Sequence, residues 1–333
     1  MIHPKLHRLP GIWIVLCSLV SVWLTSPSAS MDNNTSREFN PMALTKKTDT
    51  LFAHTMPSYI GSYTLSVRDI QSMSAFYQDV MGLKPIEIAD DRMVLGVDNV
   101  PLLYLELDES AELADPREAG LFHTAFLVPS RADLAHFLKH IAESRLALDG
   151  ASDHLVSEAL YLHDPEGNGI EVYVDRPYDE WIFDQDGVMM DTIRLDVQDL
   201  LQDAPAQVWR GMPSGTRIGH IHLKVGDLKS ADDFYHGLLM QDVQEEYPGA
   251  LFMASGKYHH HIATNIWQSR NSSGSREGKT GLKSFTIIFQ EAAFHDKVLK
   301  RLEEANTEMA AKGDDLDVKD PWGNIVQLRK AAP

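Results

Sequence analysis

The sequence predicts an α+β protein built from four βαβββ modules that are arranged in two tandem halves. The first observation is an internal repeat, in which residues 60–83 match residues 218–240 without a gap at an offset of 158. A second repeat relates residues 120–141 to residues 281–302, and a similar DP-x-G-N turn closes each of these units. Because self-similarity at a fixed spacing indicates duplicated architecture, each half should hold two similar quarters.

Each quarter is expected to begin with a strand and continue into a helix. The segment HIHLKV at 220–225 alternates as a β-strand does. The segment LKSADDFYHGLL at 228–239 has apolar residues at helical spacing, and Asp227 or Ser230 can cap its first turn. Short strands broken by Gly, Asp and Asn turns follow, as in residues 90–107. The unit is therefore βαβββ.

The repeats predict where the domains begin and end. Residues 58–175 should form a first domain of modules one and two, and residues 218–330 a second domain of modules three and four. Residues 176–217 are rich in Pro, Asp and Gln and should connect the two halves.

Residues 1–57 are expected to lie outside the fold as a signal-like or disordered segment. A basic start, an apolar run at 11–24 and a small-residue end resemble a secretory signal, so the alternative to a cytoplasmic protein is export through residues 1–30. The apolar run is shorter than the roughly 18 residues that span a bilayer. The other interpretation is that translation starts at Met31.

Composition limits the partners. The net charge of −18 and the pI near 5.2 disfavour binding to nucleic acid or to anionic membranes, and favour small-molecule or protein partners. The one cysteine, Cys17, excludes an intrachain disulfide and cysteine-based zinc sites, so His, Asp or Glu must hold any metal. A homo-oligomer is compatible with the sequence.

Equivalent positions of the four modules differ in a way that indicates a metal site. The first strands present, in chain order, Ser62, His123, His220 and Ser284. The last strands of modules two and four present Glu171 and Gln327. The two middle modules thus retain two imidazoles and a carboxylate, which is the ligand set of a facial triad that leaves three positions open on a divalent metal.

Gln327 has the length of Glu171 but not the negative charge that offsets a metal ion. We therefore expect a working site between modules two and three and an inactive equivalent between modules one and four. His222 lies on the same strand face as His220 and is the rival ligand; His220 is preferred because it aligns with His123.

Four segments carry a resemblance to a known family: GLFHTAFLVP, DHLVSEALYLHDPEGNGIEVYVDRP, IGHIHLKVGDL and KYHHHIATNIW. They resemble the vicinal oxygen chelate superfamily, and within it the bacterial catechol 2,3-dioxygenase group of extradiol ring-cleaving enzymes. The resemblance covers about residues 58–330 and implies two tandem vicinal oxygen chelate domains. It implies Fe(II), with Mn(II) as the alternative, held by His123, His220 and Glu171.

The resemblance also implies roles for five further residues. The strand that ends module three holds His259, His260 and His261, of which His261 aligns best with the acid/base of the family and His260 is next. His259 and His260 are expected to contact substrate, and His154 and Tyr161 match a His and a Tyr that contact substrate oxygens. The usual arrangement places the site in modules three and four, whereas modules two and three hold the ligands here.

The expected function is extradiol cleavage of a small aromatic diol by O₂, as in aromatic hydrocarbon catabolism. One alternative on the same scaffold is an isomerase or lyase of the glyoxalase type, which generally uses a second carboxylate as fourth ligand. The other is a metal-free binding protein that sequesters a small molecule between modules.

Overall fold

The computed structural model of the protein describes residues 51–184, 187–274, 278–313 and 315–331. The signal-like segment 1–30 lies outside the described residues. The described chain starts before the predicted boundary at residue 57, with the 3-10 helix η1 (Phe52–Thr55). Ala53 and Met56 are buried there, so apolar contacts attach this segment to the fold. Among the described helices, none is long and apolar enough to cross a membrane.

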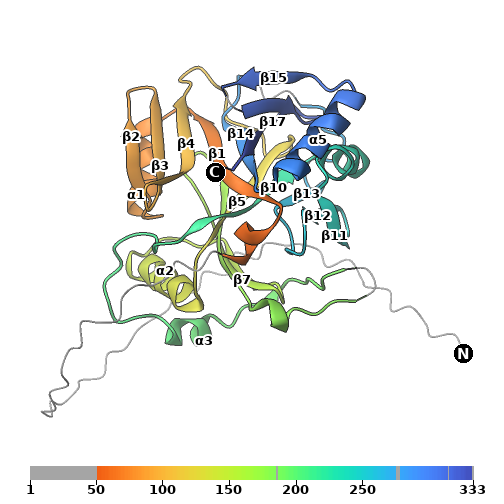
Figure 1. Cartoon of the computed structure of the whole chain (residues 1–333). Coiled ribbons are helices and arrows are strands. Elements are labelled where there is room, and N and C mark those ends of the chain that lie inside the picture. The colour runs from red at the N-terminus through yellow and green to blue at the C-terminus, as the bar shows by residue number, and fades with distance from the viewer. Residues whose placement is uncertain (1–50, 185–186, 275–277, 314, 332–333) are drawn as a thin grey trace, which may run out of the picture. The chain divides into compact units, whose positions relative to one another are not determined.

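The first two modules both have the predicted βαβββ order (Figure 1). Module one consists of β1 (Ser58–Val67), α1 (Ile70–Asp79), β2 (Lys84–Ile88), β3 (Arg92–Val97) and β4 (Val100–Leu107). Module two consists of β5 (Gly120–Leu127), α2 (Arg131–Glu143), β6 (Gly150–Asp153), β7 (Ser157–His163) and β8 (Gly169–Asp175).

The last two modules repeat this order, with one irregular helix. Module three consists of β10 (Arg217–Lys224), α4 (Leu228–Ala231), the π-helical segment η3 (Asp232–Leu238), β11 (Asp242–Tyr247), β12 (Ala250–Ala254) and β13 (Ile262–Asn265). Module four consists of β14 (Gly281–Phe289), α5 (Ala292–Glu304), β15 (Met309–Lys312), β16 (Asp315–Lys319) and β17 (Ile325–Lys330). The predicted α+β fold of four modules is confirmed.

The strands form two sheets, and each sheet combines modules from both halves of the sequence. The outer-module sheet joins modules one and four in the order β15-β16-β17-β14-β1-β4-β3-β2. The inner-module sheet joins modules two and three in the order β11-β12-β13-β10-β5-β8-β7-β6-β9. In each sheet the two first strands pair antiparallel, β1 with β14 and β10 with β5, as the orange and blue strands of the outer-module sheet illustrate (Figure 1). The domain limits 58–175 and 218–330 stay a prediction about the sequence halves, since both sheets run across them.

The connection between the halves has structure of its own. It contains η2 (Tyr178–Glu180), β9 (Ile193–Arg194) and α3 (Val197–Gln202). β9 pairs with β6 and extends the edge of the inner-module sheet.

The repeated DP-x-G-N turns hold the two modules of each half together. The Tyr77 hydroxyl in α1 donates to Asp164 over 3.0 Å, and the Tyr235 hydroxyl in η3 donates to Asp320 over 2.8 Å. Both tyrosines and both carboxylates are buried, so these hydrogen bonds satisfy groups that water does not reach. The turn motif is therefore structural, and it positions the strand that follows it.

Candidate metal centre

Four neighbouring strands of the inner-module sheet align one row of side chains. His220 on β10 pairs with Ala125 on β5, Ala125 pairs with Glu171 on β8, and Glu171 pairs with Tyr161 on β7. Directly paired residues point to the same face of a sheet. Because Ala125 has only a methyl group, it leaves space between His220 and Glu171.

His123 lies two residues before Ala125 on β5 and therefore faces the same side. Nε2 of His123 lies 3.2 Å from Nε2 of His220 and 3.0 Å from Oε2 of Glu171, and Nε2 of His220 lies 3.4 Å from that same oxygen. All three side chains are buried. The structure thus brings together the three ligands expected from the repeat comparison, and it is these three residues that form a candidate metal group among the described residues.

The charges of His220 and Glu171 suit a metal ion. Burial lowers the pKa of His220 to about 4, although Glu171 acts to raise it, so the imidazole is neutral near pH 7. Burial opposes ionisation of Glu171, but the imidazoles of His220 and His123 hold the pKa of its carboxyl well below the usual value. Neutral imidazole and ionised carboxylate are the forms that ligate a metal.

The spacing of the three ligand atoms also fits a divalent ion. Two ligands at right angles with bonds of about 2.1 Å lie about 3 Å apart. The three edges of the triangle, from 3.0 to 3.4 Å, match that spacing. The rival ligand His222 is engaged elsewhere, because its Nε2 lies 2.9 Å from the side-chain amide nitrogen of Asn265.

The three consecutive histidines were expected on a strand. They lie instead in the loop between β12 and β13. Nε2 of His261 donates to the backbone oxygen of Ala53 over 2.9 Å, and burial lowers the pKa of His261 to about 3. His260 packs against the trio instead, with its ring 4.1 Å from that of His220. This placement argues against His261 as the acid/base and favours His260, the second choice from the sequence.

His154 and Tyr161 meet beside the trio. Nδ1 of His154 donates to the backbone oxygen of Asp191 over 2.9 Å, so its Nε2 can accept from the Tyr161 hydroxyl at 2.5 Å. The Tyr161 ring lies 5.8 Å from that of His123. Burial and the neighbouring Glu171 carboxylate raise the pKa of Tyr161 well above its usual value, so its hydroxyl stays protonated.

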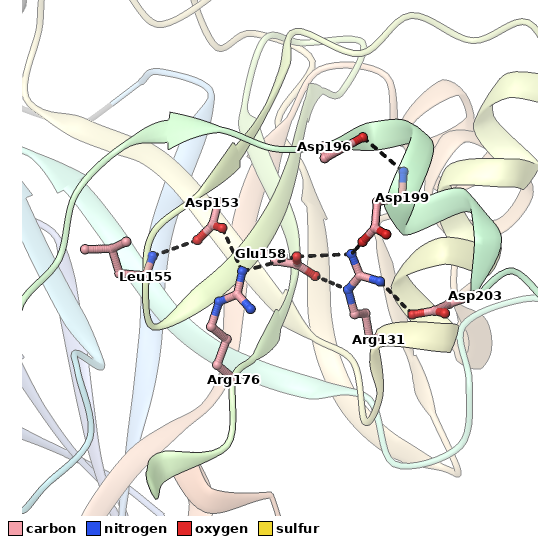
Figure 2. Close-up of polar contacts among 8 residues, drawn as sticks. All are labelled: Arg131, Asp153, Leu155, Glu158, Arg176, Asp196, Asp199 and Asp203. Carbon is pink, nitrogen blue, oxygen red and sulfur yellow. Dashed lines mark hydrogen bonds and ion pairs between the residues drawn. The ribbon is translucent and has the colours of Figure 1, made fainter. Parts of the chain in front are cut away.

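A charge network that the sequence analysis missed holds the hairpin that carries His154 (Figure 2). Arg176 binds Asp153 over 2.7 Å and Glu158 over 3.3 Å, and Arg131 binds the same Glu158 over 2.6 Å. Arg131 also reaches α3, through Asp199 and Asp203. Asp153 accepts the backbone N–H of Leu155, which has a φ of 70°, so the turn around His154 is fixed on both sides. These charged residues are far apart in the sequence and are related only by contacts in space, so no sequence pattern could have predicted the network.

Aromatic rings pack against the histidines around the trio. The ring of Phe122 lies 4.8 Å from that of His222 and 5.5 Å from that of Trp267, and the ring of Phe252 lies 5.0 Å from that of His260. An aromatic environment of this kind suits a planar apolar ligand with a few polar groups.

Comparisons with known proteins identify the family of this chain. The chain is 38% identical over 269 residues to the catechol-2,3-dioxygenase of Bacillus subtilis (strain 168), a match that covers 79% of this chain and 94% of that protein. A family model described as Glyoxalase/Bleomycin resistance protein/Dioxygenase superfamily matches residues 59–172.

Two crystal structures show the same fold at low sequence identity. The cppA protein from Streptococcus pneumoniae TIGR4 has a TM-score of 0.53 and 12% identity, covering 82% of this chain and 99% of that chain. Glyoxalase I from Zea mays has a TM-score of 0.51 and 13% identity, covering 83% of this chain and 93% of that chain. The chain belongs to the Glyoxalase/Bleomycin resistance protein/Dioxygenase superfamily, the vicinal oxygen chelate family that its motifs resemble, and it is a homologue of a catechol-2,3-dioxygenase.

Proposed function

We propose that the protein is an extradiol dioxygenase, which inserts both atoms of O₂ into a catechol-type aromatic diol at a mononuclear Fe(II) site. The observation that carries the proposal is the buried triangle of His123, Glu171 and His220 in a chain with 38% identity to a catechol-2,3-dioxygenase. Two imidazoles and one carboxylate suit Fe(II), and Mn(II) accepts the same ligands.

The three ligands would hold the ion and leave adjacent positions open. Fe(II) bound there supplies a Lewis acid and the electron transfer that chemistry with O₂ requires. The buried walls exclude water, and the orientation of both reactants in one site removes much of the entropy of their encounter.

Residues beside the triangle would handle protons and oxygen charge. His260 is neutral, because burial and the neighbouring imidazoles lower its pKa well below the usual value, so it can accept a proton from the diol and return it later. Tyr161, supported by His154, can donate a hydrogen bond to a developing oxyanion. The product is a ring-opened semialdehyde that contains both oxygen atoms.

A glyoxalase-type isomerase is the weaker alternative. Such sites generally use a second carboxylate as a fourth ligand, and among the described residues no second carboxylate joins the triangle. A metal-free binding protein would have no need of two buried imidazoles that converge on a buried carboxylate.

The direct test is to load the full chain with Fe(II) without oxygen, then add air and a panel of catechols that differ in ring substituents. We expect oxygen uptake and a yellow product with at least one of them. A protein that binds Fe(II) with unit stoichiometry but consumes no oxygen with any diol would contradict the proposal and favour the isomerase. Metal analysis of the purified protein distinguishes Fe(II) from Mn(II).

A further inference from the structure

We propose that Asp175 is a positioning residue that acts through His259 to set the tautomer of His260, so that Nε2 of His260 carries the lone pair. This inference concerns side chains behind the metal triangle. It deepens the proposed function, on which its catalytic meaning rests.

The first step is the contact between Asp175 and His259. Asp175 ends β8, four residues after Glu171, and its Oδ1 lies 3.0 Å from Nε2 of His259. An ionised carboxylate can only accept hydrogen bonds, so Nε2 of His259 must carry a proton. The Asp175 side chain is only 14% exposed and that of His259 is 0% exposed, so water competes little for this bond.

A tyrosine pair holds the carboxylate in place. The Tyr258 hydroxyl donates to the same Oδ1 of Asp175 over 3.1 Å, and the hydroxyls of Tyr258 and Tyr173 lie 2.6 Å apart. Since Tyr258 gives its proton to Asp175, it accepts the proton of Tyr173. Hydrogen bonds that run in one direction reinforce each other, so this chain fixes the orientation of the Asp175 carboxylate.

The second step is the contact between the two histidines. Nδ1 of His259 lies 2.7 Å from Nδ1 of His260. A neutral imidazole carries one proton, so His259, which is protonated at Nε2, has a lone pair at Nδ1. His260 must then donate from its Nδ1, and its own lone pair is left at Nε2.

The consequence is a base prepared before substrate binds. A histidine acts as a general base through its unprotonated nitrogen, and His260 lies beside the ligand His220. Without the acceptor at Nδ1 of His259, His260 would populate two tautomers. One of them carries its proton on Nε2, the nitrogen whose lone pair is needed for a general base. The outer-module sheet offers a contrast, because four residues after Gln327 the chain has Ala331 in place of a carboxylate.

The test reads the tautomer directly, without any turnover. The metal-free full chain is labelled with ¹⁵N at histidine, and couplings between ring nitrogens and ring protons show which nitrogen is protonated; His259→Gln and His260→Gln assign the signals. We expect wild-type His260 to be protonated at Nδ1. In Asp175→Ala, His260 should lose its preference for protonation at Nδ1. Tyr258→Phe keeps the hydrogen bond between His259 and Asp175, so in this variant His260 should retain that preference. Wild-type His260 protonated at Nε2, or a tautomer that is unchanged in Asp175→Ala, would overturn the proposal.

Activity provides a second arm that separates this inference from the proposed function. In the Fe(II)-loaded enzyme, Asp175→Ala should lower kcat by roughly 10- to 100-fold with little change in KM, a part of the typical contribution of a general base. Absence of ring cleavage in the wild type would refute the dioxygenase while the tautomer result stands. An unchanged kcat in Asp175→Ala, with cleavage intact in the wild type, would refute the role of Asp175 alone.

Discussion

The two sheets hold the same row of four positions, and the side chains differ at each one. In the inner-module sheet the paired positions hold His220, Ala125, Glu171 and Tyr161. In the outer-module sheet the corresponding pairs hold Ser62, Thr286, Gln327 and Asp317. The backbone is common to both rows, so the difference in chemistry lies in the side chains.

The outer row forms a chain of neutral hydrogen bonds that ends on a carboxylate. Ser62 donates to Thr286 over 3.3 Å, Thr286 donates to Gln327 over 3.1 Å, and the Gln327 amide donates to Asp317 over 3.2 Å. These groups satisfy one another, and Thr286 occupies the space that Ala125 leaves free. In the inner row His220 and Glu171, together with the adjacent His123, direct two imidazole nitrogens and a carboxylate at one another, an arrangement that a cation stabilises. The polar groups of the outer row thus satisfy one another through hydrogen bonds, whereas the inner row leaves three potential ligand atoms directed at one another.

The largest effect, on metal affinity, should come from replacing the carboxylate of the inner row by the amide that the outer row has at the same position. In Glu171→Gln the ligand keeps its length but loses its charge, so we expect metal affinity to fall by more than about 100-fold, since changes to residues that only support ligands already cost 10- to 100-fold. Ring cleavage should fall with it. Metal titration followed by calorimetry measures the affinity.

The matched control is Gln327→Glu. A carboxylate at position 327 would lie beside the Thr286 hydroxyl and the Asp317 carboxylate, and the positions of the two imidazoles hold Ser62 and Ser284, so it should not create a second metal site. A metal stoichiometry of two in Gln327→Glu would show that the carboxylate alone distinguishes the rows.

The next largest effect, on kcat, should distinguish His260 from His261. His260→Gln should lower kcat by about 10²- to 10⁴-fold, the usual contribution of a general base, because His260 packs on the ligand His220. His261→Gln should leave kcat within a fewfold, since His261 is bonded to the backbone of Ala53. Steady-state kinetics on a catechol decides, and the reverse pattern would restore His261 as the acid/base.

A smaller effect on metal affinity should follow from filling the space that Ala125 leaves between His220 and Glu171. Ala125→Thr introduces the hydroxyl that Thr286 provides in the outer row, and we expect metal affinity to drop by roughly tenfold because the hydroxyl can bond Glu171. The reciprocal Thr286→Ala should change only stability, by about 1 kcal/mol for the lost hydrogen bonds. Equal metal affinity in wild type and Ala125→Thr would mean that this space has no role.

The expected difference with the least bearing on the metal site is in acid stability. Burial lowers the pKa of His261 to about 3, so below the ordinary value near 6.5 the unfolded chain takes up a proton that the folded chain excludes. Its contribution to stability is fully present well above pH 6.5 and is lost as the pH falls through that value, by about 2 kcal/mol between pH 6.5 and 4.5. Urea denaturation of the metal-free protein and of His261→Gln measures this, and the variant should lose less stability over that interval. Parallel losses would contradict the assignment.

The repeat comparison could predict the modules and the convergence of His123, Glu171 and His220, because both depend on equivalence within one chain. It also placed the site between modules two and three, where β5 and β10 pair. The position of the consecutive histidines could not be predicted, since it depends on a loop that packs against the distant segment around Ala53. For the same reason the partner of His259, Asp175, gave no sequence signal: the two residues are 84 positions apart.

The measurement that tests the central claim most directly is a crystal structure of the Fe(II)-loaded protein with anomalous scattering collected at the iron edge. We predict one anomalous peak in the inner-module sheet, within bonding distance of Nε2 of His123, Nε2 of His220 and a carboxylate oxygen of Glu171, and none at the outer row. A fully occupied iron bound by other residues, or a triangle without a peak in crystals grown with saturating Fe(II), would contradict the account.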